Sequence, residues 1–144
     1  FLVSSVMLVS IGQRLVRTVC PHCQESYQPP APALRQWGLD KVSQATFTRG
    51  RGCFNCMDTG YKGRTGVFEL LVLNEYIKEA ILQRKTSYEI RRISTESSGL
   101  VTLLEDAIFK ASEGLTSYDE IIRQIPRLSK PRPLKVIQQK LREE

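Results

Sequence analysis

The residues with the clearest chemical potential are four cysteines, Cys20, Cys23, Cys53 and Cys56, which form two C-x2-C pairs, CPHC and CFNC. Each such pair can make a tight turn whose sulfurs converge on one ion at about 2.3 Å, while backbone N–H groups donate to the thiolates. Pro21 stiffens the first turn, and Gly52 helps the chain bend before the second. The spacing predicts one structural zinc ion, because four cysteines leave no open position for a catalytic water.

Two other uses of these cysteines are open. They could form redox dithiols or disulfides, although a thioredoxin-type motif belongs at the start of a helix in a βαβ unit, a setting that neither pair has. They could also be free buried thiols. His22, the only histidine, lies between two cysteines and is interpreted as an exposed residue of the first turn, so nucleophile–histidine catalysis has little material here.

The segments that position the cysteines differ in pattern. Residues 1–19 have apolar residues at spacings of three and four, which predicts a helix covered on several sides. Residues 20–62 are rich in proline and glycine, with a short helix expected over Leu34–Trp37, ending at Gly38, and a strand near Phe47. Residues 63–73 are predicted to form a strand covered on both faces, with Gly63 and Gly66 as turn and close-packing residues.

Residues 74–126 predict a series of short helices whose apolar stripes form a core. The expected N-caps are Asn74, Ser87, Thr102 and Thr116. Gly99, Gly114 and Pro126 are expected to end three of these helices. The basic tail, residues 127–144, favours extended backbone around its prolines before a last helix over Leu134–Leu141, and the sequence leaves open whether it docks or is disordered.

Composition narrows the function classes. The chain is 41% hydrophobic and 25% charged, as expected for a globular protein. Its net charge of +6 falls to +4 when four thiolates and Zn²⁺ are included, a balance that suits an acidic protein or anionic membrane surface without requiring nucleic acid. The apolar residues 1–12 lack signal-peptide flanks and are too few to span a membrane, so a segment of a longer protein is expected. Neither a phosphate loop nor a G-x-G-x-x-G motif is present, so no self-sufficient enzyme site is expected.

Three motifs occur in an order that resembles the C-terminal part of the secretion ATPases of the type II secretion and type IV pilus assembly family. They are QRLVRTVCPHC at 13–23, GCFNCMDTGYKGRTGVFELL at 52–71 and GLVTLLEDAIFKASEGLTSYDEIIR at 99–123. The resemblance covers roughly residues 1–125 and implies an α+β, mainly helical fold. That fold is a fragment of a RecA-like α/β motor domain with an inserted zinc module and a C-terminal helical domain.

The resemblance assigns roles to each segment. Residues 1–19 match the last core helix of the motor domain, 20–62 the tetracysteine zinc module, 63–73 the strand returning to the core and 74–126 the helical domain. The four cysteines match the family's zinc ligands, and nothing is transferred to the tail.

The resemblance also implies a cellular role. Members are cytoplasmic ATPases, usually hexamers, that lie under an inner-membrane platform protein and drive pilus or pseudopilus assembly. Their nucleotide-binding motifs, and hence ATP and Mg²⁺, would lie upstream of this segment in the full-length parent. The first hypothesis is therefore a structural and coupling segment of such an ATPase. The alternative is a standalone zinc ribbon that binds nucleic acid, suggested by six cations near the cysteines: Arg14, Arg17, Arg49, Arg51, Lys62 and Arg64. The scarcity of paired base-stacking aromatics weighs against it, and a redox protein is a third, weaker option.

Overall fold

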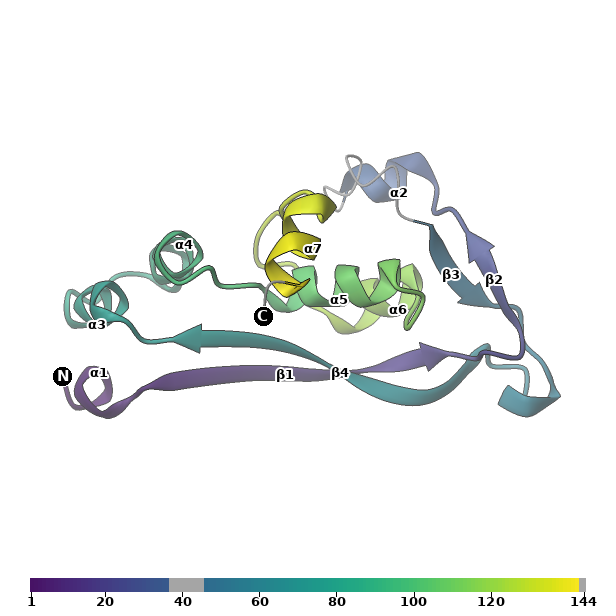
Figure 1. Cartoon of the computed structure of the whole chain (residues 1–144), viewed down its shortest axis with the longest axis horizontal. Helices are drawn as coiled ribbons and strands as arrows, with labels where there is room; N and C mark the ends of the chain where they lie inside the picture. The colour runs from purple at the N-terminus through teal and green to yellow at the C-terminus, as the bar shows by residue number, and fades with distance from the viewer. Residues whose placement is uncertain (37–45, 143–144) are drawn as a thin grey trace.

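A long two-stranded antiparallel ribbon forms the spine of the molecule (Figure 1). The computed structural model describes residues 1–36 and 46–142. Strand β1 (Val9–Val19) pairs with β4 (Tyr61–Val72), and the register runs from Val9 opposite Val72 to Val19 opposite Tyr61. The register shifts between Arg17 and Val19, where the ribbon approaches the cysteines.

The helix predicted over residues 1–19 is wrong. Only the five-residue helix α1 (Leu2–Val6) forms, and from Val9 onward that segment is strand β1. Apolar residues spaced three and four apart also satisfy part of the alternation of a strand, so spacing alone did not separate the two. Branched residues such as Val9 and Ile11 favour extended backbone, Gly12 disfavours a helix, and β4 supplies the hydrogen-bonding partner.

The strand predicted over residues 63–73 is confirmed, although it begins at Tyr61 and ends at Val72. The expectation that both of its faces are covered is wrong, because Phe68, Leu70 and Val72 are 45–48% exposed. The turn expected at Gly63 and Gly66 is also wrong, since both lie within β4. Close packing at Gly66 is confirmed: a Cβ there would lie 2.7 Å from the Phe68 ring.

A second, shorter ribbon leaves the spine beside the cysteines. Strand β2 (Gln24–Tyr27) pairs antiparallel with β3 (Phe47–Gly50), which confirms the strand expected near Phe47. Helix α2 (Ala31–Gln36) follows β2, and the short 3₁₀ turn η1 (Phe54–Cys56) connects β3 to β4. The expected helix end at Trp37 and Gly38 lies outside the described residues.

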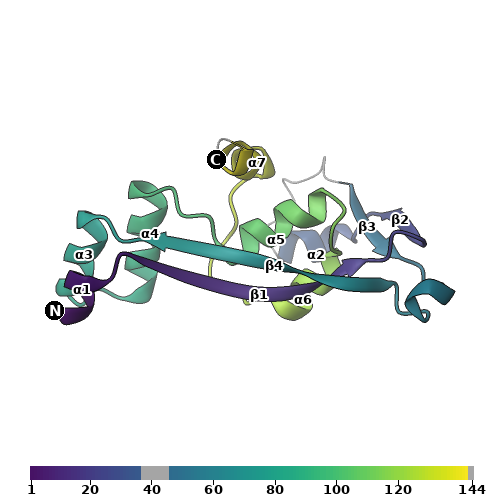
Figure 2. The ribbon, with the colours of Figure 1, turned by 60° about the horizontal axis from the view of Figure 1, so that its bottom comes forward.

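The helices form two groups along the length of the spine (Figure 2). At the end with the N-terminus, α1 packs near α3 (Glu75–Leu82), and α3 packs against α4 (Ser87–Ser97). Along the middle, α5 (Leu103–Ser112) contacts both strands and is flanked by α6 (Tyr118–Gln124) and α7 (Leu134–Arg142). The fold is therefore mixed α+β, as expected.

The main core forms where α5 and α6 cover the middle of the ribbon. Its buried members come from strands β1, β3 and β4 and from helices α2, α5, α6 and α7, with Ile125 just after α6. They are Val16, Leu34, Phe47, Val67, Leu104, Ala107, Ile108, Ala111, Tyr118, Ile121, Ile125 and Leu134. The rings of Phe47 and Tyr118 meet edge to face with centroids 5.9 Å apart. This core fixes α5 and α6 on the ribbon and joins β3 to them.

Two of the four predicted helix N-caps are confirmed. Asn74 accepts a hydrogen bond from Ile77 N, and Thr102 accepts one from Glu105 N. The cap predicted at Ser87 is one residue off, because Thr86 makes a capping box with Glu89.

The cap predicted at Thr116 is also one residue off, because Ser117 caps α6. Thr116 is buried and donates instead to the carbonyl oxygen of Arg17 at 2.8 Å, so its hydroxyl is occupied by a tertiary contact.

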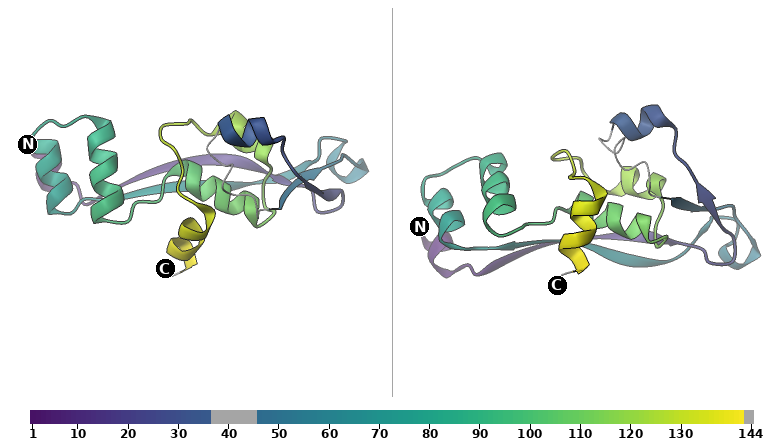
Figure 3. Two further views of the ribbon diagram at one scale, coloured as in Figure 1. Left: turned by 90° about the horizontal axis from the view of Figure 1, so that it is seen from above. Right: turned by 45° about the horizontal axis from the view of Figure 1, so that its top comes forward.

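The basic tail is docked on the helical domain, and its last helix, α7, confirms the expectation for residues 134–141 (Figure 3). Leu134 and Ile137 are buried in the packing of α7 against α5. Arg132, just before α7, donates two hydrogen bonds to the buried carboxylate of Glu105, from Nε at 2.8 Å and from Nη2 at 2.6 Å. The tail is thus an integral part of the described fold.

Candidate metal centre

The four cysteines lie at the corner where the two ribbons join, at the end of the spine far from the N-terminus (Figure 1). Cys20 directly follows β1, and Cys23 directly precedes β2. Cys53 and Cys56 frame the η1 turn between β3 and β4. Each ribbon therefore contributes both of its strands to hold the sulfurs in place.

The sulfur positions match the corners of a tetrahedron. Sγ–Sγ separations are 3.9 Å for Cys20 and Cys53, 3.8 Å for Cys23 and Cys56, and 3.7 Å for Cys53 and Cys56. All four sulfurs lie within 4.8 Å of one another. Four sulfurs placed about 2.3 Å from a central ion would be about 3.8 Å apart, whereas a disulfide would bring two of them to about 2.05 Å. The donor set fits a tetrahedral thiolate-bound metal ion, and zinc is an ion that suits such a set.

Backbone N–H groups support the sulfurs. Cys53 N and Gly60 N donate to the Cys56 sulfur at 3.2 and 3.3 Å. The two turns are also tied to each other, since Cys20 N donates to Gly60 O at 2.9 Å and Arg51 N donates to Cys23 O at 3.0 Å. The two donors to the Cys56 sulfur stabilise its charged thiolate form, which is the form that binds a metal.

Close approach of two glycines makes this corner possible. A Cβ added to Gly50 would lie 2.1 Å from the carbonyl oxygen of Gly60, closer than any side chain tolerates. Gly60 itself has a φ of +77°, in the left-handed region that favours glycine. No spacing rule predicts these two positions, although Gly60 follows the second cysteine pair by four residues.

The thiols of Cys23 and Cys56 are not equivalent. Burial raises the pKa of Cys23 to about 12, and its sulfur neighbours add to the effect. Burial also opposes ionisation of Cys56, but the N–H donors of Gly60 and Cys53 outweigh it and lower that pKa to about 6. A cluster that holds one thiolate readily and another only with difficulty is suited to a cation that displaces the remaining protons.

Every cysteine predicted as a ligand joins this cluster, and the one histidine does not. Cys20, Cys23 and Cys56 are buried, Cys53 is partly buried, and His22 is exposed on the first turn. The residues that sequence reasoning missed are those that brace the cluster, above all Gly60 and Thr59. Thr59 Oγ1 donates to the Cys56 carbonyl at 2.6 Å.

The metal corner is fastened to the helical domain by Arg17 of β1. Its guanidinium donates to Glu120 Oε2 at 2.7 Å, and its backbone N–H donates to Glu120 Oε1 at 3.0 Å. The same guanidinium stacks 4.0 Å from the centroid of the Tyr61 ring, whose hydroxyl lies 2.6 Å from Ser117 Oγ. Glu120 is 1% exposed, and its pKa is lowered because the hydrogen bonds and charge of Arg17 outweigh the effect of burial. These contacts join the end of β1 beside the cysteines to α6.

Comparison with known proteins points to one family. The family described as "Type II/IV secretion system protein" matches residues 1–123. The chain is 39% identical over 124 residues to the type IV pilus assembly ATPase PilB of Thermus thermophilus, an alignment that covers 85% of this chain and 14% of that protein. It is 36% identical over 123 residues to the type II secretion system protein E of Pseudomonas aeruginosa, covering 85% of this chain and 24% of the relative. The chain thus spans between about a seventh and a quarter of the length of these relatives.

The matched region covers the spine, the cysteine corner and the helices through most of α6, while α7 lies beyond it. Within the described ranges, none of the helices has both the length and the apolar content needed to cross a bilayer.

Proposed function

Because the chain belongs to the type II/IV secretion system protein family, we propose that it is the C-terminal part of an ATPase that powers type II secretion or type IV pilus assembly. In this role the chain supplies a structural zinc module and a helical domain for partner docking and motor coupling. The nucleotide-binding motifs, with ATP and Mg²⁺, belong to an upstream part of the full-length protein, and this segment corresponds to the end of its RecA-like motor domain.

One observation carries the structural half of the proposal. Three of the Sγ–Sγ distances between the four cysteines are 3.7–3.9 Å, so the sulfurs form a ligand set for one ion. This corner has little apolar core of its own. Zinc bound there substitutes for hydrophobic packing, since binding energy at such sites is folding energy. The module is therefore rigid only when loaded.

Coupling to the motor follows from how the corner is attached. The β1/β4 ribbon runs from the metal corner to the α1/α3/α4 group, and Arg17, Glu120 and Tyr61 join it to α6 on the way. In this proposal a force applied at the tip reaches the helical domain through the buried contact between Arg17 and Glu120.

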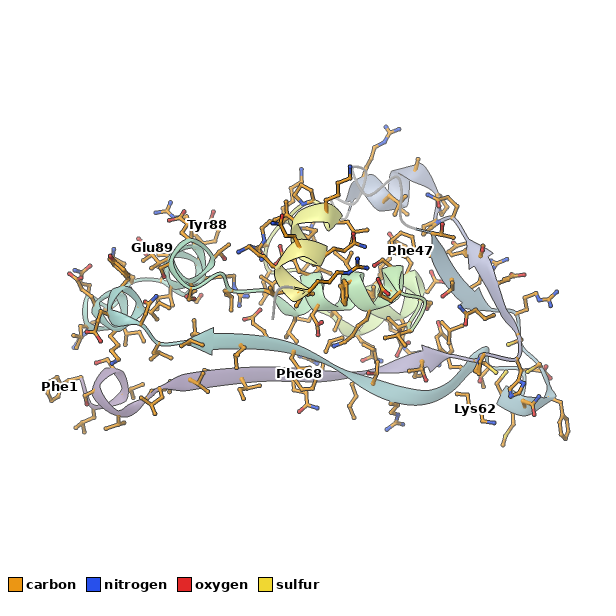
Figure 4. All side chains as sticks on the ribbon, viewed as in Figure 1. Phe1, Phe47, Lys62, Phe68, Tyr88 and Glu89 are labelled. Atoms are coloured by element: carbon orange, nitrogen blue, oxygen red, sulfur yellow. The ribbon has the colours of Figure 1, made fainter. Side chains whose placement is uncertain are left out.

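Docking is assigned to the outer surface of the η1 turn. Phe54 and Met57 are 96% and 87% exposed on this turn, and Figure 4 shows Lys62 close by at the same end of the ribbon. Burying two such side chains in a partner would stabilise a complex by roughly 3–6 kcal/mol, since each large apolar side chain contributes about 1.5–3 kcal/mol. The proposed partner is the inner-membrane platform protein. The chain would then lie on the cytoplasmic side of that membrane, as part of a homohexamer.

The nucleic-acid alternative has less support from the structure. Of the six cations that suggested it, Arg17 pairs with Glu120, while Arg49 and Arg51 pair with Glu25. The affinity of a true nucleic-acid module for DNA or RNA would fall steeply as the salt concentration is raised. A flat, weak response at low salt would dismiss that alternative.

The proposal is tested in the full-length protein that carries this segment, by complementation of a strain that lacks it. Cys53→Ser is expected to lose bound zinc and assembly activity. Phe54→Ala combined with Met57→Ala is expected to keep one zinc per chain and basal ATP hydrolysis while losing pilus or pseudopilus assembly. Asn55→Ala, on the same exposed turn, is the matched control and should be silent. Full assembly by the double variant would refute docking through η1, and a full-length protein without ATPase activity would refute the motor assignment.

A further inference from the structure

A small basic cavity lies where the C-terminal tail crosses α4. Its volume is about 180 Å³. It is lined by Tyr88, Arg91, Arg92, Thr95, Glu96, Thr102, Glu105, Ser129, Lys130 and Arg132. Figure 4 marks Tyr88 on α4, one wall of this cavity, and the opposite wall is the tail before α7. The cavity lies away from the cysteine corner and takes no part in the function proposed above.

Two of its cations have no partner in the described part of the chain. Neither Arg92 nor Lys130 makes a side-chain hydrogen bond or an ion pair there, and both side chains are exposed. Arg92 influences the pKa of Glu89 only as a weak charge effect, behind the hydrogen bonds that Glu89 receives from Thr86. Two unpaired cations directed at one small space repel each other unless an anion joins them.

The two paired arginines keep donors to spare. Arg91 uses Nη1 on Glu69 at 2.7 Å, and Arg132 uses Nε and Nη2 on Glu105 and the Leu100 carbonyl. Because a guanidinium has five N–H donors, each retains hydrogens for another acceptor. The lining carries four cations against two carboxylates. Its remaining side chains end in hydroxyl groups, of which that of Thr95 donates to the Arg91 carbonyl oxygen at 2.9 Å.

We propose that this cavity binds a phosphate group, held between Arg92 of α4 and Lys130 of the tail. The cavity volume of about 180 Å³ is many times the roughly 10–15 Å³ that one water needs, so it admits a phosphate group. Planar guanidinium groups and a lysine ammonium are the side chains that recognise phosphate best. The phosphate could be free or could be the end group of a nucleotide or a lipid.

Binding at this place would regulate the tail. Ser129, Lys130 and Arg132 belong to the tail, whereas Tyr88, Arg91, Arg92 and Thr95 belong to α4, so the site is complete only while the tail is docked. A ligand that binds only the docked form favours it by the factor 1 + [L]/Kd, about 100-fold at 100 times Kd. The family match ends at residue 123, so this site joins a matched helix to a segment beyond the match.

The experiment titrates the whole chain, loaded with zinc, with inorganic phosphate, adenosine monophosphate or phosphatidylglycerol vesicles, at constant ionic strength set with chloride. Binding is followed by calorimetry and by amide exchange in residues 127–142. Lys130→Gln and Arg92→Gln are each expected to weaken binding at least about 10-fold, since a charge-assisted hydrogen bond accounts for about that much. Lys135→Gln, on the exposed side of α7 and outside the lining, is the matched control.

Saturable binding of any of the three probes, lost in both variants and kept in the control, with slower exchange in the tail, supports the proposal and identifies the source of the phosphate. Binding of none of them, or equal binding by wild type and both variants, overturns it. Slower tail exchange that chloride alone reproduces also overturns it, because screening would then be the cause.

Discussion

Replacing Arg132 by methionine should detach the C-terminal tail. Arg132 is 21% exposed at its side chain and Glu105 is 3% exposed, so their ion pair is largely withdrawn from water. The change removes three hydrogen bonds of 2.6–2.8 Å, two to Glu105 and one to the Leu100 carbonyl. Methionine keeps much of the apolar stem, so the loss reports mainly on the polar contacts.

The expected loss of unfolding free energy is about 3 kcal/mol. Breaking one partner of a buried ion pair costs roughly 3–5 kcal/mol, and the lower end applies because Glu105 keeps donors from Thr102 N and Arg132 N. For a chain of this size, about 3 kcal/mol corresponds to a fall in Tm of roughly 10 °C. Thermal and urea unfolding of the zinc-loaded chain, followed by circular dichroism, measures this loss of unfolding free energy. Lys135→Met on the exposed side of α7 is the control and should shift Tm by less than about 2 °C.

The pH dependence provides an independent check on the same contact. Glu105 has a lowered pKa, because the hydrogen bonds and charge of Arg132 outweigh the effect of burial. A carboxyl with a lowered folded pKa contributes stability above its unfolded pKa of about 4.3 and loses it as pH falls through the folded value. The gap between wild type and Arg132→Met should therefore be full at pH 7 and close in acid. A loss below 1 kcal/mol at pH 7, or a gap that widens in acid, would refute the docked tail.

Three further outcomes are expected. Cys53→Ser should lower zinc, measured by atomic absorption, well below one per chain and speed amide exchange in residues 46–62; zinc retained near one per chain would show that the ligand set is wrong. Gly50→Ala should destabilise the cysteine corner and weaken zinc binding, because its Cβ would meet Gly60 O at 2.1 Å, and a wild-type zinc affinity by competition titration would contradict this. Glu120→Gln should lower stability by about 2–4 kcal/mol at pH 7 and much less below pH 4, where the wild-type carboxyl with its lowered pKa also becomes protonated; an equal loss in acid would argue against the Arg17 contact.

The ribbon shows where sequence reasoning reached its limit. Residues 9–19 satisfied a helical spacing, yet they form a strand because residues 61–72 pair with them across some forty residues of intervening chain. Single-segment periodicity carries no information about such a partner. The N-caps at Thr86 and Ser117 were missed by one residue for a related reason: Ser/Thr neighbours are chemically equivalent, and tertiary contacts such as Thr116 with the Arg17 carbonyl select between them.

The sequence by itself determined the candidate metal-binding cysteines, the strand after them, the caps at Asn74 and Thr102 and the final helix, because each depends on residue types at short, fixed spacings. Only the tertiary structure decided that the first segment is a strand, that Arg17 and Glu120 lock the metal corner to α6, and that Arg132 ties the tail to Glu105. The partners of these two ion pairs are 103 and 27 residues apart in the sequence. Each pair forms because a buried carboxylate needs a cation beside it, and no local sequence pattern predicts which cation that is.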